Sequence, residues 1–428
     1  MWRISKKICS VDLTPSADVI RGHLLSIYDA ALTAVHGHSC VSHYLQEHPV
    51  TGPVYVIAMG KAAAAMMSGA VETLGSQIQD AFIVTKRGHG QSFPWSCHEA
   101  GHPLPDESSL ECGDRLVQFA QGIPESARVL VLLSGGASAL VEKLPEGIQL
   151  EDLIRINAWL LGSGWDIARI NQVRKRFSLL KGGRLASVLA PRPVLCLAIS
   201  DVPNDDPAAI GSGMLSCDPE EIVGSDLPAF IRALLPRLPK TTPVDTSHVK
   251  TEIIASLSQA KQAAVVAAQA LDYEVVCHDE FIGGDVRQAG ERLNQCLQSS
   301  DAGLVHVWGG ETTVSLPTNP GRGGRNQSLA LCVARYIAGK GRAWFLAAGS
   351  DGTDGPGNDA GALVDHETLK RGQATGFDSA DALIRADAGT FLEASGDLIH
   401  TGPTGTNVMD IMLGLRLDQQ RGSRAPCA

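Results

Sequence analysis

Short apolar runs rich in β-branched residues alternate along this chain with alanine- and leucine-rich stretches of helical length. Val54–Met59 is predicted to be a buried strand, and an alanine-rich helix is predicted to follow it through about Leu74. Strands that are apolar on both faces and are separated by helices are typical of a mostly parallel sheet with helices on both sides. The sequence therefore predicts an α/β fold. The other strands are expected at 81–85, 128–133, 193–199, 273–277, 304–308 and 343–348, and the other helices at 150–161, 166–189 and 284–299.

The length of 428 residues is enough for two or three domains at roughly 100–200 residues each. Residues 235–249 (LPRLPKTTPVDTSHV) are rich in proline and threonine, a composition that suits a linker between domains. We therefore expect a boundary near residues 236–250, with a first domain over 1–240 and a second over 250–428.

The charge balance limits the class of partner. The chain has 36 lysines and arginines against 46 aspartates and glutamates, a net charge of −10, which argues against a nucleic-acid binder or a polybasic membrane binder. No apolar run reaches the ~18–20 residues that a membrane span needs, and the first ten residues do not resemble a signal peptide. The 10 cysteines occur without a CxxC pair. We therefore expect a protein of the reduced cytoplasm.

Five of the predicted strands end in loops of Gly, Ser, Lys, Asp or Glu, at 60–61, 134–138, 200–201, 309–312 and 349–352. In open α/β sheets, ligands bind outside the carboxyl ends of the strands. Glycine lets backbone N–H groups approach a phosphate closely, although any one of these glycines could equally well close a tight turn. Because the five loops have a similar composition, we expect them to share one site.

The loop 134–138 is the best candidate for a phosphate cradle, because it offers two hydroxyls and unobstructed backbone amides before a predicted helix. It is not a Walker A loop, and Leu140 replaces the last glycine of a nucleophile elbow. Lys61, directly after a buried strand, could present its charge to a transferring phosphoryl group. The alternative is a solvated lysine at a helix start, where the helix dipole disfavours a cation.

Carboxylates crowd the end of the strand 193–199. Asp201, Asp205 and Asp206 suit Mg²⁺, and one of them could take the proton of an attacking hydroxyl. For Asp205 and Asp206, the capping of a proline-rich turn is an equally good explanation. A later glycine turn carries Arg325, whose guanidinium suits a carboxylate or a phosphate.

Three other patterns do not point to a site. No G-x-G-x-x-G follows a strand, so the dinucleotide fingerprint is missing. Ser178 and Lys181 have the spacing of a serine–lysine nucleophile pair, but the partner motifs are absent, and we expect both on a helix surface beside Arg174. The three histidines within 89–102 lack a metal-ligand spacing and are predicted to lie in loops.

Taken in order, these loops resemble those of the type-2 glycerate kinases, a family with a C-terminal MOFRL domain. The resemblance covers nearly the whole chain, and such a set is far more specific than any single motif. The matching segments are GKAA (60–63), GHG (88–90), EAGHPLPD (99–106), LSGGASAL (133–140), NQVRK (171–175), SLLKGGRLA (178–186), SDVPNDDP (200–207), GGETTV (309–314), GRGGRNQ (321–327), GSDGTDG (349–355), DAGA (359–362) and TGPTGTN (401–407).

The resemblance implies a Rossmann-like N-terminal domain with a mostly parallel sheet, a smaller α/β domain of MOFRL type, and an active site in the cleft between them. It implies transfer of the γ-phosphoryl group of ATP to D-glycerate, giving 2-phosphoglycerate, with Mg²⁺. The functional lysine of the family matches Lys61, which would stabilise the migrating charge. Its acidic residue matches Asp201, which would orient or deprotonate the hydroxyl. The oligomeric state stays open, a homodimer being one option.

The site residues predicted on this basis fall into three groups. Those for phosphate or substrate are Ser134, Gly135, Gly136, Ser138, Arg325, Asn326 and Gln327. Those for the nucleotide are Gly309, Gly310, Glu311, Thr312, Asp351, Asp354 and Asn407. Those for the metal are Asp201 and Asp206.

The chain departs from the family pattern at three places. Ala137 replaces the third glycine of SGGGS, Met214-Leu215 replaces a Pro-Thr pair, and Ser350 replaces the threonine of G-T-D-G. Three alternative functions stay open: a hydroxypyruvate reductase, as members of this family have been labelled; a non-catalytic glycerate- or nucleotide-binding regulator; and a kinase for another small hydroxy acid, such as tartronate or a tetronate. The missing dinucleotide fingerprint argues against the first, and the intact Lys61, Asp201 and Arg325 argue against the second.

Overall fold

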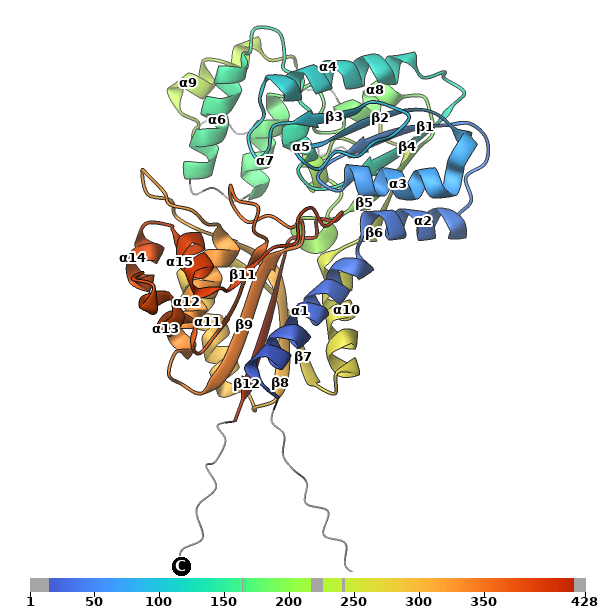
Figure 1. The fold of residues 1–428 in the computed structure, drawn as a ribbon. Helices are drawn as coiled ribbons and strands as arrows, with labels where there is room; N and C mark the ends of the chain where they lie inside the picture. Colours follow the sequence, from blue (N-terminus) through green and yellow to red (C-terminus); the bar gives the residue numbers. More distant parts are fainter. Residues whose placement is uncertain (1–14, 164, 166, 217–225, 241–242, 419–428) are drawn as a thin grey trace, which may run out of the picture.

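Two six-stranded sheets organise the molecule, one above the other in Figure 1. The computed structural model describes residues 15–163, 165, 167–216, 226–240 and 243–418. Apolar strands buried on both faces form the centre of each sheet, the edge strands β6 and β7 are more exposed, and helices cover the sheets. The predicted α/β class is therefore confirmed.

The first sheet has the strand order β3-β2-β1-β4-β5-β6, and all of its neighbouring strands are parallel. A parallel sheet brings the carboxyl ends of its strands to one edge, so the loops after β1, β4 and β5 lie near one another. The predicted parallel sheet of the N-terminal half is thus confirmed. Its strands are β1 (Val54–Met59), β2 (Ile78–Lys86), β3 (Cys97–Ala100), β4 (Arg128–Leu133), β5 (Val194–Ile199) and β6 (Val249–Ala255).

The second sheet is mixed, with the order β11-β10-β9-β12-β8-β7. Its β7 and β8 are parallel, and its other neighbouring pairs are antiparallel. Its strands are β7 (Glu274–Asp285), β8 (Leu304–Thr313), β9 (Arg342–Gly349), β10 (Gly361–Asp365), β11 (Leu398–Ile399) and β12 (Asp410–Leu417).

One apolar core runs through both units. It joins α1, α2, α3 and α10 to one face of each sheet. In the described part of the chain no helix is both long enough and apolar enough to cross a membrane. The helices are α1 (Ala17–Ala34), α2 (Gly37–Glu47), α3 (Ala63–Leu74), α4 (Glu107–Gly122), α5 (Ala137–Leu140), α6 (Leu150–Gly162), α7 (Ile167–Arg176), α8 (Arg184–Leu189), α9 (Ala229–Arg232), α10 (Leu257–Ala270), α11 (Val286–Ser299), α12 (Arg325–Ile337), α13 (Thr368–Ala374), α14 (Ser379–Ile384) and α15 (Ala388–Ser395).

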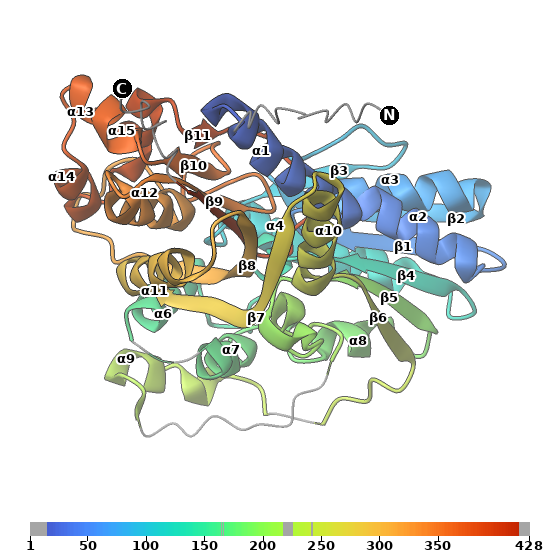
Figure 2. The same cartoon turned by 90° about the horizontal axis from the view of Figure 1, so that it is seen from below.

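The two units share the ends of their sequences. β6 pairs with β5 and completes the first sheet, although it follows the proline-rich segment. Helix α1 lies beside α10 on the second sheet, as Figure 2 shows from below. We therefore propose a boundary just after Ala255, rather than near 236–250, and place α1 with the second unit. Residues 241–242 of the predicted linker lie outside the described residues.

The helix predicted over 166–189 is wrong in its middle. Helix α7 ends at Arg176 and α8 begins at Arg184. Gly182 and Gly183 take positive φ values of 62° and 80°, which break a helix and which glycine adopts without steric cost. Between the helices, the hydroxyl of Ser178 accepts hydrogen bonds from the N–H groups of Leu180 and Lys181. Ser178 and Lys181 are therefore buried loop residues rather than residues of a helix surface.

The predicted end of the strand 304–308 is also wrong. β8 continues to Thr313, with Gly309 and Gly310 paired to both β12 and β7. A Cβ on Gly310 would lie 2.2 Å from the carbonyl oxygen of Ile282, so glycine lets the two strands approach at this point. His98 likewise lies in a strand, β3, rather than in a loop.

Candidate active site

Lys61 lies just beyond the carboxyl end of β1 and reaches the second unit. Its Nζ donates a 2.6 Å hydrogen bond to Oδ2 of Asp351, in the loop after β9, and both side chains are largely buried. Burial works to lower the pKa of Lys61, but the charge and hydrogen bond of Asp351 outweigh it and the pKa rises. Burial opposes ionisation of Asp351 too, yet Lys61 holds the pKa of that carboxyl down at about 2. Lys61 is therefore a fixed cation at the junction of the two sheets.

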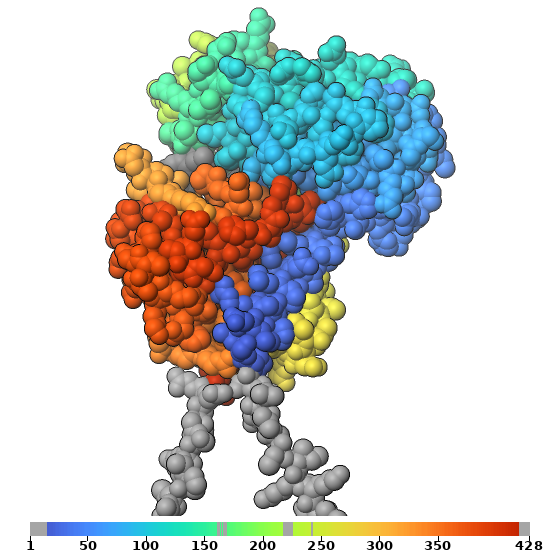
Figure 3. All heavy atoms as spheres, viewed as in Figure 1, coloured from blue at the N-terminus to red at the C-terminus, as the bar shows by residue number. Residues whose placement is uncertain are grey.

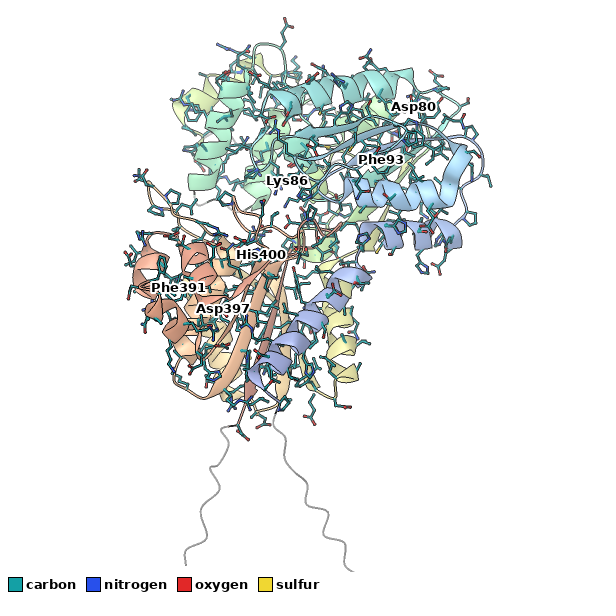
Figure 4. The ribbon with its side chains drawn as sticks, viewed as in Figure 1. Asp80, Lys86, Phe93, Phe391, Asp397 and His400 are labelled. Carbon is teal, nitrogen blue, oxygen red and sulfur yellow. The ribbon has the colours of Figure 1, made fainter. Side chains whose placement is uncertain are left out.

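A second contact joins the units beside this pair. Lys86, at the end of β2, donates to the hydroxyl of Thr353 at 3.3 Å. Figure 4 labels Lys86 at the edge of the first unit that faces the loops of the second. In Figure 3 the segments of the C-terminal half, in orange and red, press against that same edge. The loop 349–355 is thus held against the first sheet at two points.

The predicted phosphate loop follows β4, and its hydrogen bonds hold the backbone of Lys61 in position. Gly60 has a φ of 122°, and a Cβ there would lie 2.2 Å from the Ser134 hydroxyl. That hydroxyl accepts a 3.0 Å hydrogen bond from the N–H of Ala62, and the N–H of Lys61 donates to the carbonyl of Gly135 at 2.9 Å. Ser134 is fully buried, so its hydroxyl aligns the two loops and does not face the cavity.

Asp201 follows β5 and lines the same cavity as Lys61. The side-chain amide of Asn407, from the second unit, donates to its Oδ2 at 3.4 Å. Burial raises the pKa of Asp201 to about 6; Lys61 works against that rise, while Glu311 adds to it. A carboxyl with this pKa is ionised at neutral pH and basic enough to accept a proton.

Gly135 makes this approach of Asp201 and Asn407 possible. A Cβ on Gly135 would lie 1.9 Å from the Asp201 carboxylate and 2.0 Å from the Asn407 amide. We therefore expect Gly135→Ala to push Asp201 aside and to lower kcat by ~10²-fold, the loss that a displacement of about 1 Å can cause. The matched control is Gly122→Ala at the end of α4, where a Cβ would meet nothing within 4 Å. Steady-state kinetics and thermal melting of both variants test this, and equal activities would contradict it.

Arg325, at the start of α12, is clamped by two carboxylates. Its Nε and Nη2 donate to Asp410 at 2.6 and 3.0 Å, and its Nη1 pairs with Glu311 at 2.9 Å. Burial raises the pKa of Glu311, and the charge of Arg325 only partly offsets it. The guanidinium is therefore pre-oriented where it lines the cavity.

The next two residues of this motif turn inward. Asn326 and Gln327 are fully buried, and their backbone N–H groups donate to Asp354 at 3.1 and 2.8 Å. Asp354 thereby caps α12, and burial raises its pKa to about 7. These three residues hold the start of α12, and with it Arg325, in position. They do not line the described cavity.

The predicted residues that converge line one cavity of about 470 Å³ between the two sheets. They are Lys61, Gly136, Ser138, Asp201, Glu311, Arg325 and Asn407. Asp351 reaches the cavity through Lys61. Gly309, Gly310 and Thr312 lie in β8, and Thr312 is buried. Asp206 is exposed and caps its own turn, accepting from the N–H of Ala208 at 2.9 Å, so it stands outside the cavity.

Several cavity residues were missed from the sequence. Lys181 and Glu142 form a buried ion pair on the wall. Arg174, on α7, donates to the side-chain oxygen of Asn157 at 2.9 Å, and burial lowers its pKa. His102 lies beside Lys61 and Gly136, and burial lowers its pKa to about 3, so it is neutral. The segments NQVRK, SLLKGGRLA and EAGHPLPD contain three of these side chains, but nothing in their spacing distinguishes a cavity residue from a surface one.

Known protein families and proteins are similar in sequence to this chain. The chain matches a domain of unknown function (DUF4147) over residues 23–228 and the MOFRL family over residues 304–410. It is 36% identical over 381 residues to a D-glycerate 2-kinase of Thermotoga maritima, an alignment that covers 85% of this chain and 90% of that protein. The chain belongs to the glycerate kinase family. The family predicted from the loops is therefore confirmed.

A further relative in sequence has a different name, and a solved structure shares the fold. A protein of Agrobacterium vitis named putative hydroxypyruvate reductase is 35% identical over 407 residues, covering 91% of this chain and 92% of its own. The crystal structure of a glycerate kinase from Thermotoga maritima superposes with a TM-score of 0.80 at 32% identity, covering 94% of this chain and all of that one. The fold of the glycerate kinase family thus extends over nearly the whole of this protein.

Proposed function

We propose that this protein is a D-glycerate 2-kinase, which transfers the γ-phosphoryl group of ATP to the 2-hydroxyl of D-glycerate. The observation that carries the proposal is the convergence of Lys61 and Asp201, from the ends of β1 and β5, on one cavity that Arg325 of α12 also lines. Phosphoryl transfer requires chiefly positioning and the neutralisation of charge. The cavity supplies a fixed cation, a carboxylate able to accept a proton and a clamped guanidinium.

Lys61 and Asp201 have complementary tasks in this reaction. The ammonium of Lys61 stabilises negative charge on the phosphoryl oxygens in the transition state, from a buried position that needs no reorganisation. Asp201 accepts the hydrogen bond of the 2-hydroxyl and takes its proton as the new O–P bond forms. Asn407, which holds one carboxylate oxygen, orients the other toward the hydroxyl.

Arg174 is the group that suits the substrate carboxylate. It lines the cavity, and among the described residues its side chain is seen to bond to the Asn157 amide oxygen and not to a carboxylate. A partly buried guanidinium without an anionic partner favours an anionic ligand. Its position on the wall formed by α7 is on the side of Asp201 and the first sheet, where glycerate would present its hydroxyl.

Arg174→Ala is therefore expected to raise the KM for D-glycerate by ~10–100-fold, the loss of a hydrogen bond to a charged group, with a smaller change in the KM for ATP. Arg155→Ala is the matched control, because Arg155 lies on neighbouring α6 over the ring of Phe230 and does not line the cavity. Initial-rate kinetics with each substrate varied in turn measure both constants. An unchanged KM for D-glycerate would remove Arg174 from substrate binding.

The residues present also fit Mg²⁺. Glu311 and Asp201 line the cavity, and burial raises the pKa of both carboxyls, which a bound cation would offset. These two residues would hold the ion; exposed Asp206 would not. When bound, the ion neutralises charge on the phosphate oxygens. The chain's own Lys61 and Arg325 lie on the same cavity and bind phosphate oxygens independently of the metal.

A coupled ADP-release assay with ATP, Mg²⁺ and a panel of small hydroxy acids tests the proposal, with the position of the phosphate read by ³¹P NMR. We expect turnover with D-glycerate and a 2-phospho product. Phosphorylation of a different acid, and not of D-glycerate, would identify that acid as the substrate. Oxidation of NADH by hydroxypyruvate without ATP would favour the reductase instead.

A further inference from the structure

A second polar cluster lies away from the active site, between β7, β8 and α11. In the described part of the chain, one group of three His, Cys or acidic side chains has the spacing for a metal ion: His278, Cys296 and His306. None of the three lines the cavity. Glu311 on β8 is five residues beyond His306, about 17 Å at the rise of a strand, so this cluster is remote from phosphoryl transfer.

A bulge in β7 places His278 in the cluster. Cys277 pairs with Val307 and Phe281 with Gly309, so three residues of β7, His278 to Glu280, stand opposite the single Trp308. Bulges re-aim side chains and recur at functional sites. The Nζ of Lys261 donates to the carbonyl of His278 at 2.5 Å and so satisfies a backbone group that the bulge removes from the ladder. The local backbone is thus built around this histidine.

The three ligand atoms already stand close to a metal-binding arrangement. Nε2 of His278 is 2.9 Å from Nδ1 of His306, and Sγ of Cys296 is 3.9 Å from the first and 4.0 Å from the second. In a tetrahedral zinc site with bonds of about 2.1 Å to nitrogen and 2.3 Å to sulfur, ligand atoms are about 3.4–3.6 Å apart. Each distance here differs from that by less than about 1 Å, which a small rotation of the imidazoles covers.

The surroundings keep the two imidazoles neutral. Burial lowers the pKa of His278, and it lowers the pKa of His306 to about 4. The ring of Trp308 lies parallel to both, at angles of 12° and 11°. His306 is buried and its Nε2 has no hydrogen-bond partner, so Nδ1 provides its contact with the cluster. Neutral imidazole and thiolate are the ligands that zinc prefers.

We propose that His278, Cys296 and His306 form a three-ligand site for a borderline transition-metal ion of the Zn²⁺ class, with water as the fourth ligand. Binding forms two metal–nitrogen bonds and one metal–sulfur bond in place of bonds to water in the hydrated ion. It breaks the hydrogen bond between the two imidazoles, whose shared ring proton moves to the other nitrogen of its ring, and it releases the thiol proton of Cys296 to solvent. The ion would fasten α11 to β7 and β8, because one ligand comes from each.

Zinc and cobalt titrations of the full-length protein test the proposal. After addition of Zn²⁺ and gel filtration, we expect one equivalent of zinc per chain by elemental analysis and a higher melting temperature. Co²⁺ should give tetrahedral d–d bands together with a thiolate-to-cobalt charge-transfer band. Cobalt held by the oxygen ligands of the active site lacks the thiolate band, so that band separates the two sites.

Variants locate the site. Cys296→Ser should abolish the thiolate band, and His278→Gln, at a half-buried position, should weaken Co²⁺ binding by at least about tenfold. Cys277→Ser is the matched control, since Cys277 is exposed and adjacent to His278 but outside the cluster, and it should keep the band. A wild-type protein without the band, or a band retained in Cys296→Ser, would overturn the proposal. The histidines would then form a hydrogen-bonded pair and nothing more.

Discussion

Asp201→Asn is expected to lower kcat by ~10²–10⁴-fold, the usual contribution of a positioned general base. The amide preserves the shape of the side chain and its place beside Asn407, but it cannot accept the proton of the 2-hydroxyl. Asp206→Asn is the matched control, because Asp206 lies five residues further on, is exposed, and only caps its own turn. Initial rates at saturating ATP and D-glycerate compare the two variants. Equal losses in both would contradict the role of Asp201.

The pH dependence of kcat tests the role of Asp201 independently. Burial raises the pKa of Asp201 to about 6, and only the ionised carboxylate accepts a proton. Bound Mg²⁺ would offset part of this rise, so at saturating Mg²⁺ the kcat of the wild-type enzyme should fall only as the pH drops below about 6, and it should level off above that pH. The residual activity of Asp201→Asn should lack this limb. A limb that persists near pH 7 would point instead to Asp354, whose pKa burial raises to about 7.

Lys61→Ala is the second large effect, with kcat expected to fall by ~10²–10³-fold, as when a preorganised donor to a developing charge is removed. The change also leaves the buried Asp351 carboxylate unpaired, which destabilises the fold. The double variant Lys61→Ala/Asp351→Asn separates the two effects, because it should regain melting temperature while its kcat stays low. Lys143→Ala controls for loss of a surface lysine paired with an aspartate. Recovery of activity in the double variant would mean that Lys61 acts only as a structural partner.

The convergence at the active site could be predicted because it follows from one rule of topology. The loops after β1, β4 and β5 had to meet once the strands were parallel, so Lys61, Gly135 and Asp201 were predictable together. The direction of the later strands was not, because a strand buried on both faces has the same apolar pattern whether its neighbour is parallel or antiparallel. The mixed order of the second sheet therefore could be known only from the structure.

Neighbouring residues of a single motif lie in different environments, which the sequence could not reveal. In the run Arg325-Asn326-Gln327, successive residues point about 100° apart around α12, so the arginine reaches the cavity while the two amides turn into the core. Lys181 was expected on a helix surface, but α7 ends at Arg176, and Lys181 lies in the loop before two left-handed glycines, where it is buried against Glu142. Such outcomes depend on tertiary partners that lie far away in the chain.

The proposed function requires that residues of both units bind a single substrate in one cavity. A crystal structure with D-glycerate, Mg²⁺ and a non-hydrolysable ATP analogue tests it most directly. We predict the 2-hydroxyl of glycerate within about 2.6–3.2 Å of the Asp201 carboxylate, with the Lys61 ammonium on the terminal phosphate. Glycerate bound with its hydroxyl beyond the reach of Asp201, or a nucleotide whose phosphates lie away from Lys61, would contradict the account.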